Sequence, residues 1–234
     1  MGYSVTVIHY VYVLTSLVNA NCTHDKFYGT KAIGIGYMTA ITQDQISVYP
    51  SLLTALGERD NYTKGHCDRV HKLALQMGSA VGLHAEDMET LRIASLLHDI
   101  GKIGVRDAVL LKPGKFTPEE WEEMKAHSIY GERIINSTFL SNKTAVASVV
   151  RHHHEAYDGS GYPDGLAASE IPLNCRILLV IDSYDAITTG RAYHEARTHN
   201  EAMDILLKES GTKLDPQFME IFLSTIETST SSFN

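Results

Sequence analysis

The chain has 234 residues, a formal net charge of −8 and a hydrophobic fraction of 44%. This length can bury a full hydrophobic core, so we expect one main domain with a modest extra piece. The negative charge argues against the basic face that captures DNA or RNA polymers, so any anionic ligand must be held locally. Cys22, Cys67 and Cys175 are odd in number and far apart, which favours reduced thiols in the cytoplasm over a disulfide framework.

An apolar stretch runs from Val5 to Val18 near the start of the sequence. It is short for a membrane-spanning helix, contains His9 and has no basic leader. Its β-branched and aromatic residues predict a buried strand, followed by a glycine-rich turn at residues 29–36. A cleaved signal or a membrane anchor is the alternative. We treat residues 1–45 as an N-terminal segment of unassigned type.

Helical periodicity begins near Gln43 and continues to the end of the chain, because apolar residues recur at spacings of three and four. Residues 46–234 are therefore predicted to form an all-α domain. Thr117, Pro118 and two following acids form a helix start signal. Further helices are predicted at residues 85–98, 118–136, 144–154, 174–190, 200–209 and 216–226.

Histidines and aspartates gather at helix ends and on apolar faces of the predicted helices. His98 and Asp99 follow an apolar run, and Gly101 is expected to turn the chain away after them. His153 continues the buried stripe of the helix at 144–154, and His154 extends the same face. Buried imidazoles cost free energy unless they are bonded or ligated, so two neighbours call for one shared explanation. A metal supplies one.

The same argument applies to an acid in a third apolar run. Asp182 lies within RILLVIDSYDAI, where an ionised carboxylate is costly unless a cation compensates it. Taken singly, each such residue has a plain alternative: a helical histidine is more often a bonded core or surface residue, and Asp182 could pair with Arg191. Taken together, they offer five imidazoles and two carboxylates from separate helices, which suffice for two metal ions: His66, His98, Asp99, His127, His153, His154 and Asp182. The absence of cysteine disfavours a closed structural zinc site.

The motifs HDIGK, HHHEAYDGSGYPDG and LLKPGKFTPEEWEEMKAH resemble those of the HD-GYP family of cyclic dinucleotide phosphodiesterases. The resemblance covers residues 58–193 and implies a five-helix HD core with additional helices. It assigns the metal-ligand role to the same seven residues, and catalytic roles to His98, Asp99 and Lys102. It also implies that Lys102 and Arg191 contact a substrate phosphate, that Tyr162 lies near the substrate, and that Asp185 supports the site by hydrogen bonding.

Two positions depart from the family pattern. Family members with a third metal carry a glutamate where this chain has Tyr62, so we expect two divalent ions, with iron or manganese favoured by the mixed nitrogen and oxygen ligands. His194 stands where a second basic residue often holds the substrate, so it is a candidate substrate contact whose effect on base preference is open.

The expected activity is hydrolysis of cyclic di-GMP, or of a related molecule such as 3′3′-cGAMP, to a linear dinucleotide, and a further cut to mononucleotides is left open. Two alternatives remain open at this point: a catalytically silent receptor for a cyclic dinucleotide, and a general HD phosphohydrolase acting on mononucleotides. We expect no nucleic acid polymer and no membrane as partner, and a homodimer is left open.

Overall fold

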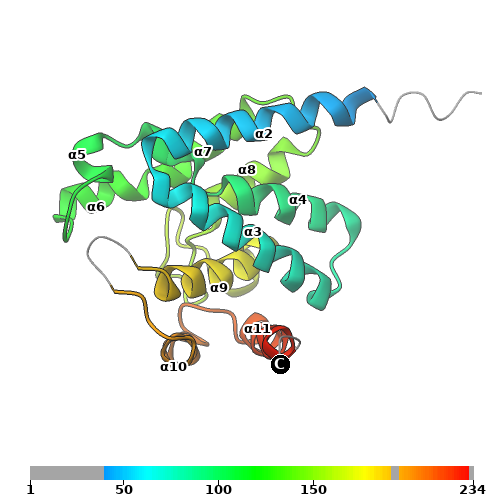
Figure 1. Ribbon diagram of the computed structural model, residues 1–234, viewed down its shortest axis with the longest axis vertical. Coiled ribbons are helices and arrows are strands. Elements are labelled where there is room, and N and C mark those ends of the chain that lie inside the picture. Colours follow the sequence, from blue (N-terminus) through cyan, green and yellow to red (C-terminus); the bar gives the residue numbers. More distant parts are fainter. Residues whose placement is uncertain (1–39, 191–194, 232–234) are drawn as a thin grey trace, which may run out of the picture. The chain divides into compact units, whose positions relative to one another are not determined.

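The computed structural model describes residues 40–190 and 195–231 (Figure 1). Contacts along the chain divide it into two units, Met1–Ala40 and Ile41–Asn234. The predicted strand and turn of the N-terminal segment, together with Cys22, lie outside the described residues. The domain boundary after residue 45 stays a prediction.

The second unit is helical, which confirms the predicted all-α class. Within the described ranges there is no β-strand, and one isolated bridge joins Ser210 and Leu214. Two short 3-10 helices, η1 and η2, interrupt the α-helices. In chain order the elements are α2 (Ala40–Arg59), α3 (Asn61–Val81), α4 (Ala85–Leu97), η1 (Ile100–Gly104), α5 (Asp107–Leu110), α6 (Pro118–Lys125), α7 (His127–Asn136), α8 (Lys143–His152), η2 (Ala168–Glu170), α9 (Leu173–Thr188), α10 (His199–Glu209) and α11 (Pro216–Ser231).

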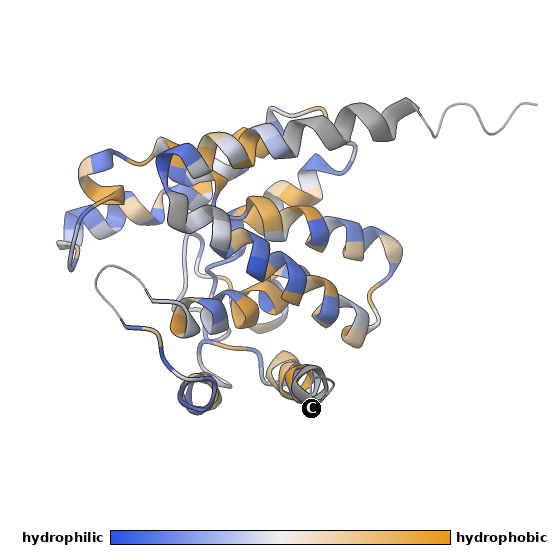
Figure 2. Cartoon of the chain, viewed as in Figure 1, coloured by the Kyte–Doolittle hydropathy of each residue, from blue (hydrophilic) through white to orange (hydrophobic). Residues whose placement is uncertain are grey.

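Helices α3, α4, α7, α8 and α9 supply most of the core, in agreement with the expected five-helix core, and α2, α10 and α11 add further buried side chains to it. The closest packing joins α7 with α8, α3 with α4 and α3 with α9, and η1 packs against α7. Figure 2 shows hydrophobic and hydrophilic bands alternating along α3 and α4, as amphipathic helices require. Leu97, Val150, Leu178 and Phe222 are fully buried in one continuous cluster. Among the described residues, no helix is both long and apolar enough to span a bilayer.

The predicted start of α6 is confirmed in detail. The hydroxyl of Thr117 accepts a hydrogen bond from the backbone N–H of Glu120, whose carboxylate accepts one from the N–H of Thr117 at 2.7 Å. This reciprocal pair satisfies two backbone donors that the helix cannot satisfy itself. Pro118 occupies the first helical position, where its missing N–H costs nothing.

The single helix predicted for residues 118–136 is wrong, because the structure has two helices that meet at Ala126. Ala126 has a ψ angle of −14°, and its N–H is shared between the carbonyls of Glu122 and Glu123. This tightened turn redirects the chain before His127, the first residue of α7. No glycine or proline marks the break in the sequence, so local propensity could not reveal it.

Candidate metal centre

Five helices or their ends supply the seven predicted ligands. His66 lies within α3 and Asp182 within α9, while His98 and Asp99 directly follow α4. His153 is fully buried, as the predicted stripe requires, but the helix does not extend to His154. Helix α8 ends at His152, His153 caps it with helical dihedral angles, and His154 lies in the turn beyond. This turn directs His154 toward His127, with ring centroids 5.1 Å apart.

Six of the seven side chains converge as two groups of three potential ligands. In the first group, His66 Nε2 lies 3.1 Å from both His98 Nε2 and Asp182 Oδ1. The second group consists of His127, His153 and His154, and Nε2 of His127 lies 3.4 Å from Nε2 of His153. His66, His98, His127 and His153 have at most 2% of their surface exposed. The structure therefore brings together imidazoles that lie far apart in the sequence.

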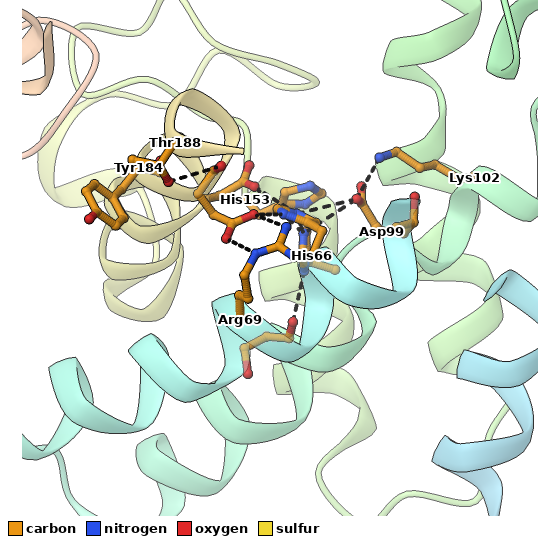
Figure 3. A network of polar contacts seen from close by, with 12 residues as sticks. His66, Arg69, Asp99, Lys102, His153, Tyr184 and Thr188 are labelled. Carbon is orange, nitrogen blue, oxygen red and sulfur yellow. Dashed lines mark hydrogen bonds and ion pairs between the residues drawn. The ribbon is translucent and has the colours of Figure 1, made fainter. Parts of the chain in front are cut away.

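Asp99 links the two groups. Its Oδ2 atom lies 3.6 Å from His98 Nε2 and 3.8 Å from His66 Nε2, whereas Oδ1 lies 3.5 Å from His127 Nε2. Figure 3 shows Asp99 between His66 and the ammonium group of Lys102. A carboxylate with one oxygen toward each group has the geometry of a bridging ligand.

Hydrogen bonds on the outer side of the rings fix their orientation. The Nδ1–H groups of His98, His127 and His153 donate to the carbonyls of Ser95, Met124 and Val150 at 3.0, 2.7 and 2.7 Å. A carbonyl only accepts, so each Nδ1 carries the proton and each neutral ring presents a bare Nε2 to the cluster. The bare nitrogens of His127 and His153 face each other at 3.4 Å, which is unfavourable without a shared cation. The inward-facing imidazole nitrogens of His98, His127 and His153 therefore fit a metal ion.

The protonation states agree with this fit. Burial lowers the pKa of His98, His127, His153 and His154, in the last case to about 3, so these rings stay neutral. Burial also lowers the pKa of His66, but its hydrogen bonds to Asp182 and Asp185 outweigh that effect and raise it to about 9. A cation bound by His66 Nε2 would displace the proton held there, since metal binding releases ligand protons.

The two carboxylates are ionised. Burial by itself raises the pKa of Asp99, but the Lys102 ammonium 2.6 Å away and the surrounding rings hold it well below its usual range. Burial acts in the same way on Asp182, where the hydrogen bond with His66 reverses the shift. Neutral imidazoles and ionised carboxylates are the forms that bind metal.

Asp185 lies behind His66, where the sequence placed a supporting residue. Its Oδ2 atom accepts a hydrogen bond from His66 Nδ1 at 2.7 Å, and Arg69 donates to both of its oxygens at 2.6 and 2.9 Å (Figure 3). This bidentate pair holds the carboxylate that orients the imidazole. Arg69 was not predicted, although its position three residues after His66 on one helix was an available signal.

A cavity of about 390 Å³ opens onto both ligand groups. Lys102 and Tyr162 line it together with Trp121 and Phe116 from the α6 region. The role of Lys102 and Tyr162 as substrate contacts stays a prediction. Burial raises the pKa of Tyr162, so its phenol stays a neutral donor. The predicted contacts Arg191 and His194 lie outside the described residues, and so does the side chain of Tyr62.

The loop that carries Tyr162 is held by Glu155, a second residue that the sequence reasoning missed. The side chain of Glu155 is only 1% exposed, and its carboxylate accepts hydrogen bonds from the backbone N–H groups of Asp164, Gly165 and Leu166 at 2.7, 3.2 and 3.0 Å. Its position directly after the paired histidines was the available signal.

Known proteins are similar to this chain in sequence and in fold. The family model described as "HD domain" matches residues 40–218. Among curated relatives, the "Cyclic di-GMP phosphodiesterase response regulator RpfG" of Xanthomonas campestris pv. campestris is 36% identical over 80% of this chain and 49% of its own length. The "3'3'-cGAMP-specific phosphodiesterase 2" of Vibrio cholerae is 30% identical over 81% of this chain and 36% of its own length. The chain thus spans half or less of these relatives.

A solved structure supports the fold. The cyclic GMP-AMP specific phosphodiesterase V-cGAP3 of V. cholerae superposes with a TM-score of 0.60 at 20% identity, over 76% of this chain and 48% of that chain. These matches confirm the resemblance found in the sequence motifs. The chain belongs to the HD domain family.

Proposed function

We propose that this chain is a metal-dependent phosphodiesterase that hydrolyses a 3′,5′-linked cyclic dinucleotide, with cyclic di-GMP as its substrate and 3′3′-cGAMP as the close alternative. One observation carries the proposal: two groups of ligand atoms joined by Asp99 open onto a cavity lined by Lys102 and Tyr162. The names of the relatives, which are phosphodiesterases for these two substrates, support the substrate class.

We assign the seven residues of the cluster as ligands of two divalent ions, iron or manganese, because imidazole and carboxylate together suit these metals. When bound, such ions supply an acidified water and polarise the phosphoryl oxygens of a diester. Asp99 would be a ligand at both positions, so its loss would remove a ligand from each.

Lys102 would hold the substrate phosphate. Its ammonium group lines the cavity and is held 2.6 Å from Asp99 Oδ2, so it presents a positive charge next to the ligand groups. This charge offsets the negative charge that builds on a phosphate during hydrolysis. Tyr162, a neutral phenol on a braced loop, can donate a hydrogen bond to the ligand or rest its ring against it. Asp185 keeps His66 in orientation.

The direct test is product analysis with anaerobically prepared, metal-analysed protein and a panel of cyclic dinucleotides. We expect linear dinucleotide from cyclic di-GMP or 3′3′-cGAMP. Binding without any linear product would identify a receptor instead. Cleavage of simple mononucleotides, unaffected by Tyr162→Ala, would identify a general phosphohydrolase.

A pair of aspartate variants tests the ligand assignment. Asp99→Ala should lose both bound metal and turnover, since it removes the residue that faces both groups. Asp204→Ala, an exposed position on α10, is the matched control and should retain both. An Asp99→Ala protein with full metal content and activity would reject the assignment. The cytoplasmic location and the homodimer stay predictions, and light scattering of the purified chain tests the second.

A further inference from the structure

The cavity has a wall that contributes nothing to the ligand groups. The segment from the end of α5 into α6 lines it with Leu111, Pro113, Phe116 and Trp121. Lys112 also lines this wall, but its ammonium group pairs with the Glu120 carboxylate at 2.5 Å. The other four side chains offer apolar and aromatic surface, and their chemistry does not suit a metal or a phosphate. A ligand that uses this wall must therefore have an apolar or aromatic part besides its phosphates.

A series of rings leads from the ligand groups to this wall. The rings of His154 and Tyr162 have centroids 4.9 Å apart, and the Tyr162 and Trp121 centroids are 6.0 Å apart at an interplanar angle of 81°. Phe116 stacks beside Trp121 at 6.2 Å and 23°. An aromatic surface thus begins next to the proposed phosphate site and extends away from it.

Trp121 is a large apolar side chain of which 43% is exposed. It is the only tryptophan in the sequence. The small apolar cluster beneath this segment consists of Val105, Val109 and Met124 with Leu110 and Phe116, and Trp121 is not part of it. The backbone of Trp121 is held in the capped first turn of α6, where its N–H donates to the carbonyl of Thr117 at 2.9 Å. Core packing therefore does not explain this indole.

We infer that Trp121, flanked by Phe116, is a stacking platform for one nucleobase of the bound dinucleotide. This inference rests on the proposed function, since it places the phosphate of the same nucleotide at the ligand groups. Aromatic rings bind the face of a base and do not read its hydrogen-bonding edge, so the platform accepts guanine and adenine alike. It supplies affinity for cyclic dinucleotides and leaves discrimination between them to other residues.

Steady-state kinetics on cyclic di-GMP and 3′3′-cGAMP test the platform in three variants. Trp121→Ala should raise KM for both substrates by a similar factor, roughly 10- to 100-fold, with kcat little changed. Trp121→Phe keeps an aromatic face and should restore most of the affinity. Phe139→Ala is the matched control, because Phe139 is 95% exposed and does not line the cavity, and its KM should equal that of the wild type.

The single tryptophan also gives a direct optical signal. Rapid mixing of the wild-type protein with either substrate should change the indole emission during the first turnover, and Trp121→Phe, which has no tryptophan, should show no such change. This measurement decides the matter even if Trp121→Ala does not fold.

An unchanged emission, or a KM in Trp121→Ala no different from that of Phe139→Ala, would overturn the platform. A KM increase confined to one of the two substrates would also overturn it, because stacking does not discriminate between them. In each of these cases an active wild type leaves the proposed function standing. If the wild type cleaves neither substrate, the proposed function itself is wrong.

Discussion

Replacing Gly101 with alanine should separate η1 from α7 and so disturb the site between them. Gly101 lies inside η1, and a Cβ atom added there would come 1.8 Å from the carbonyl oxygen of His127 and 2.4 Å from the backbone nitrogen of Gly131. Both are backbone atoms, so no side-chain rotation can relieve the contact.

The size of the effect follows from this contact. Ordinary van der Waals contact begins near 3.4 Å, so the two elements must move apart by more than 1 Å. Overpacking typically costs about 1–3 kcal/mol and more where backbone must shift, so we expect a loss of about 3 kcal/mol in the free energy of unfolding. In a chain of this size that lowers Tm by roughly 6–12 °C. The same movement would pull Asp99 away from His127, and a misplacement of about 1 Å can cost roughly 100-fold in turnover.

Gly65→Ala is the matched control, since Gly65 lies within α3 next to His66. A Cβ atom there meets only the flexible end of Arg69, at 3.4 Å. Alanine should stabilise this helix by up to about 1 kcal/mol. Thermal unfolding, metal content and turnover of the two variants form the assay. A Gly101→Ala protein as stable and active as Gly65→Ala would refute the steric reasoning.

Three further predictions concern the surroundings of the site. Glu155→Gln places an amide donor against backbone donors of the 164–166 loop and should cost about 1–3 kcal/mol in unfolding free energy. An unchanged denaturation midpoint would show that the Glu155 carboxylate does not hold this loop. Asp185→Asn should weaken metal affinity roughly 10- to 100-fold with the fold retained, because His66 loses its ionised partner. Competition with a chelator measures the affinity, and a value equal to that of the wild type would exclude an orienting role for Asp185. Chelation of the wild type should lower Tm by roughly 11–22 °C relative to protein with ions at 100 times Kd, because each of the two ions contributes about 2.7 kcal/mol, and a metal-independent Tm would count against the centre.

Much of the local structure could be predicted from sequence because its causes are local. The helix starting at Pro118 depends on Thr117 and Glu120, which lie within one turn of each other. Apolar spacing likewise predicts the helix at Ala85–Leu97 to within a residue. Interactions over three or four positions leave a direct trace in the order of residues.

Features that depend on a distant neighbour were predicted less well. Gly101 was expected to turn the chain after His98, but it lies inside η1, where it allows close approach to the carbonyl of His127. The break at Ala126 and the end of α8 before His153 have the same character, since each redirects a histidine toward partners on other elements.

The sequence by itself determined the all-α class, most helix positions and the set of side chains with metal-binding chemistry, because residue type and short-range spacing carry that information. Only the tertiary structure decided that these side chains meet as two groups with Asp99 between them, which partners hold His66 and the Tyr162 loop, and that Trp121 lines the cavity. Those outcomes depend on contacts between residues separated by tens of positions, such as His66 and Asp185. The packing of whole helices fixes such contacts, and no short stretch of sequence encodes them.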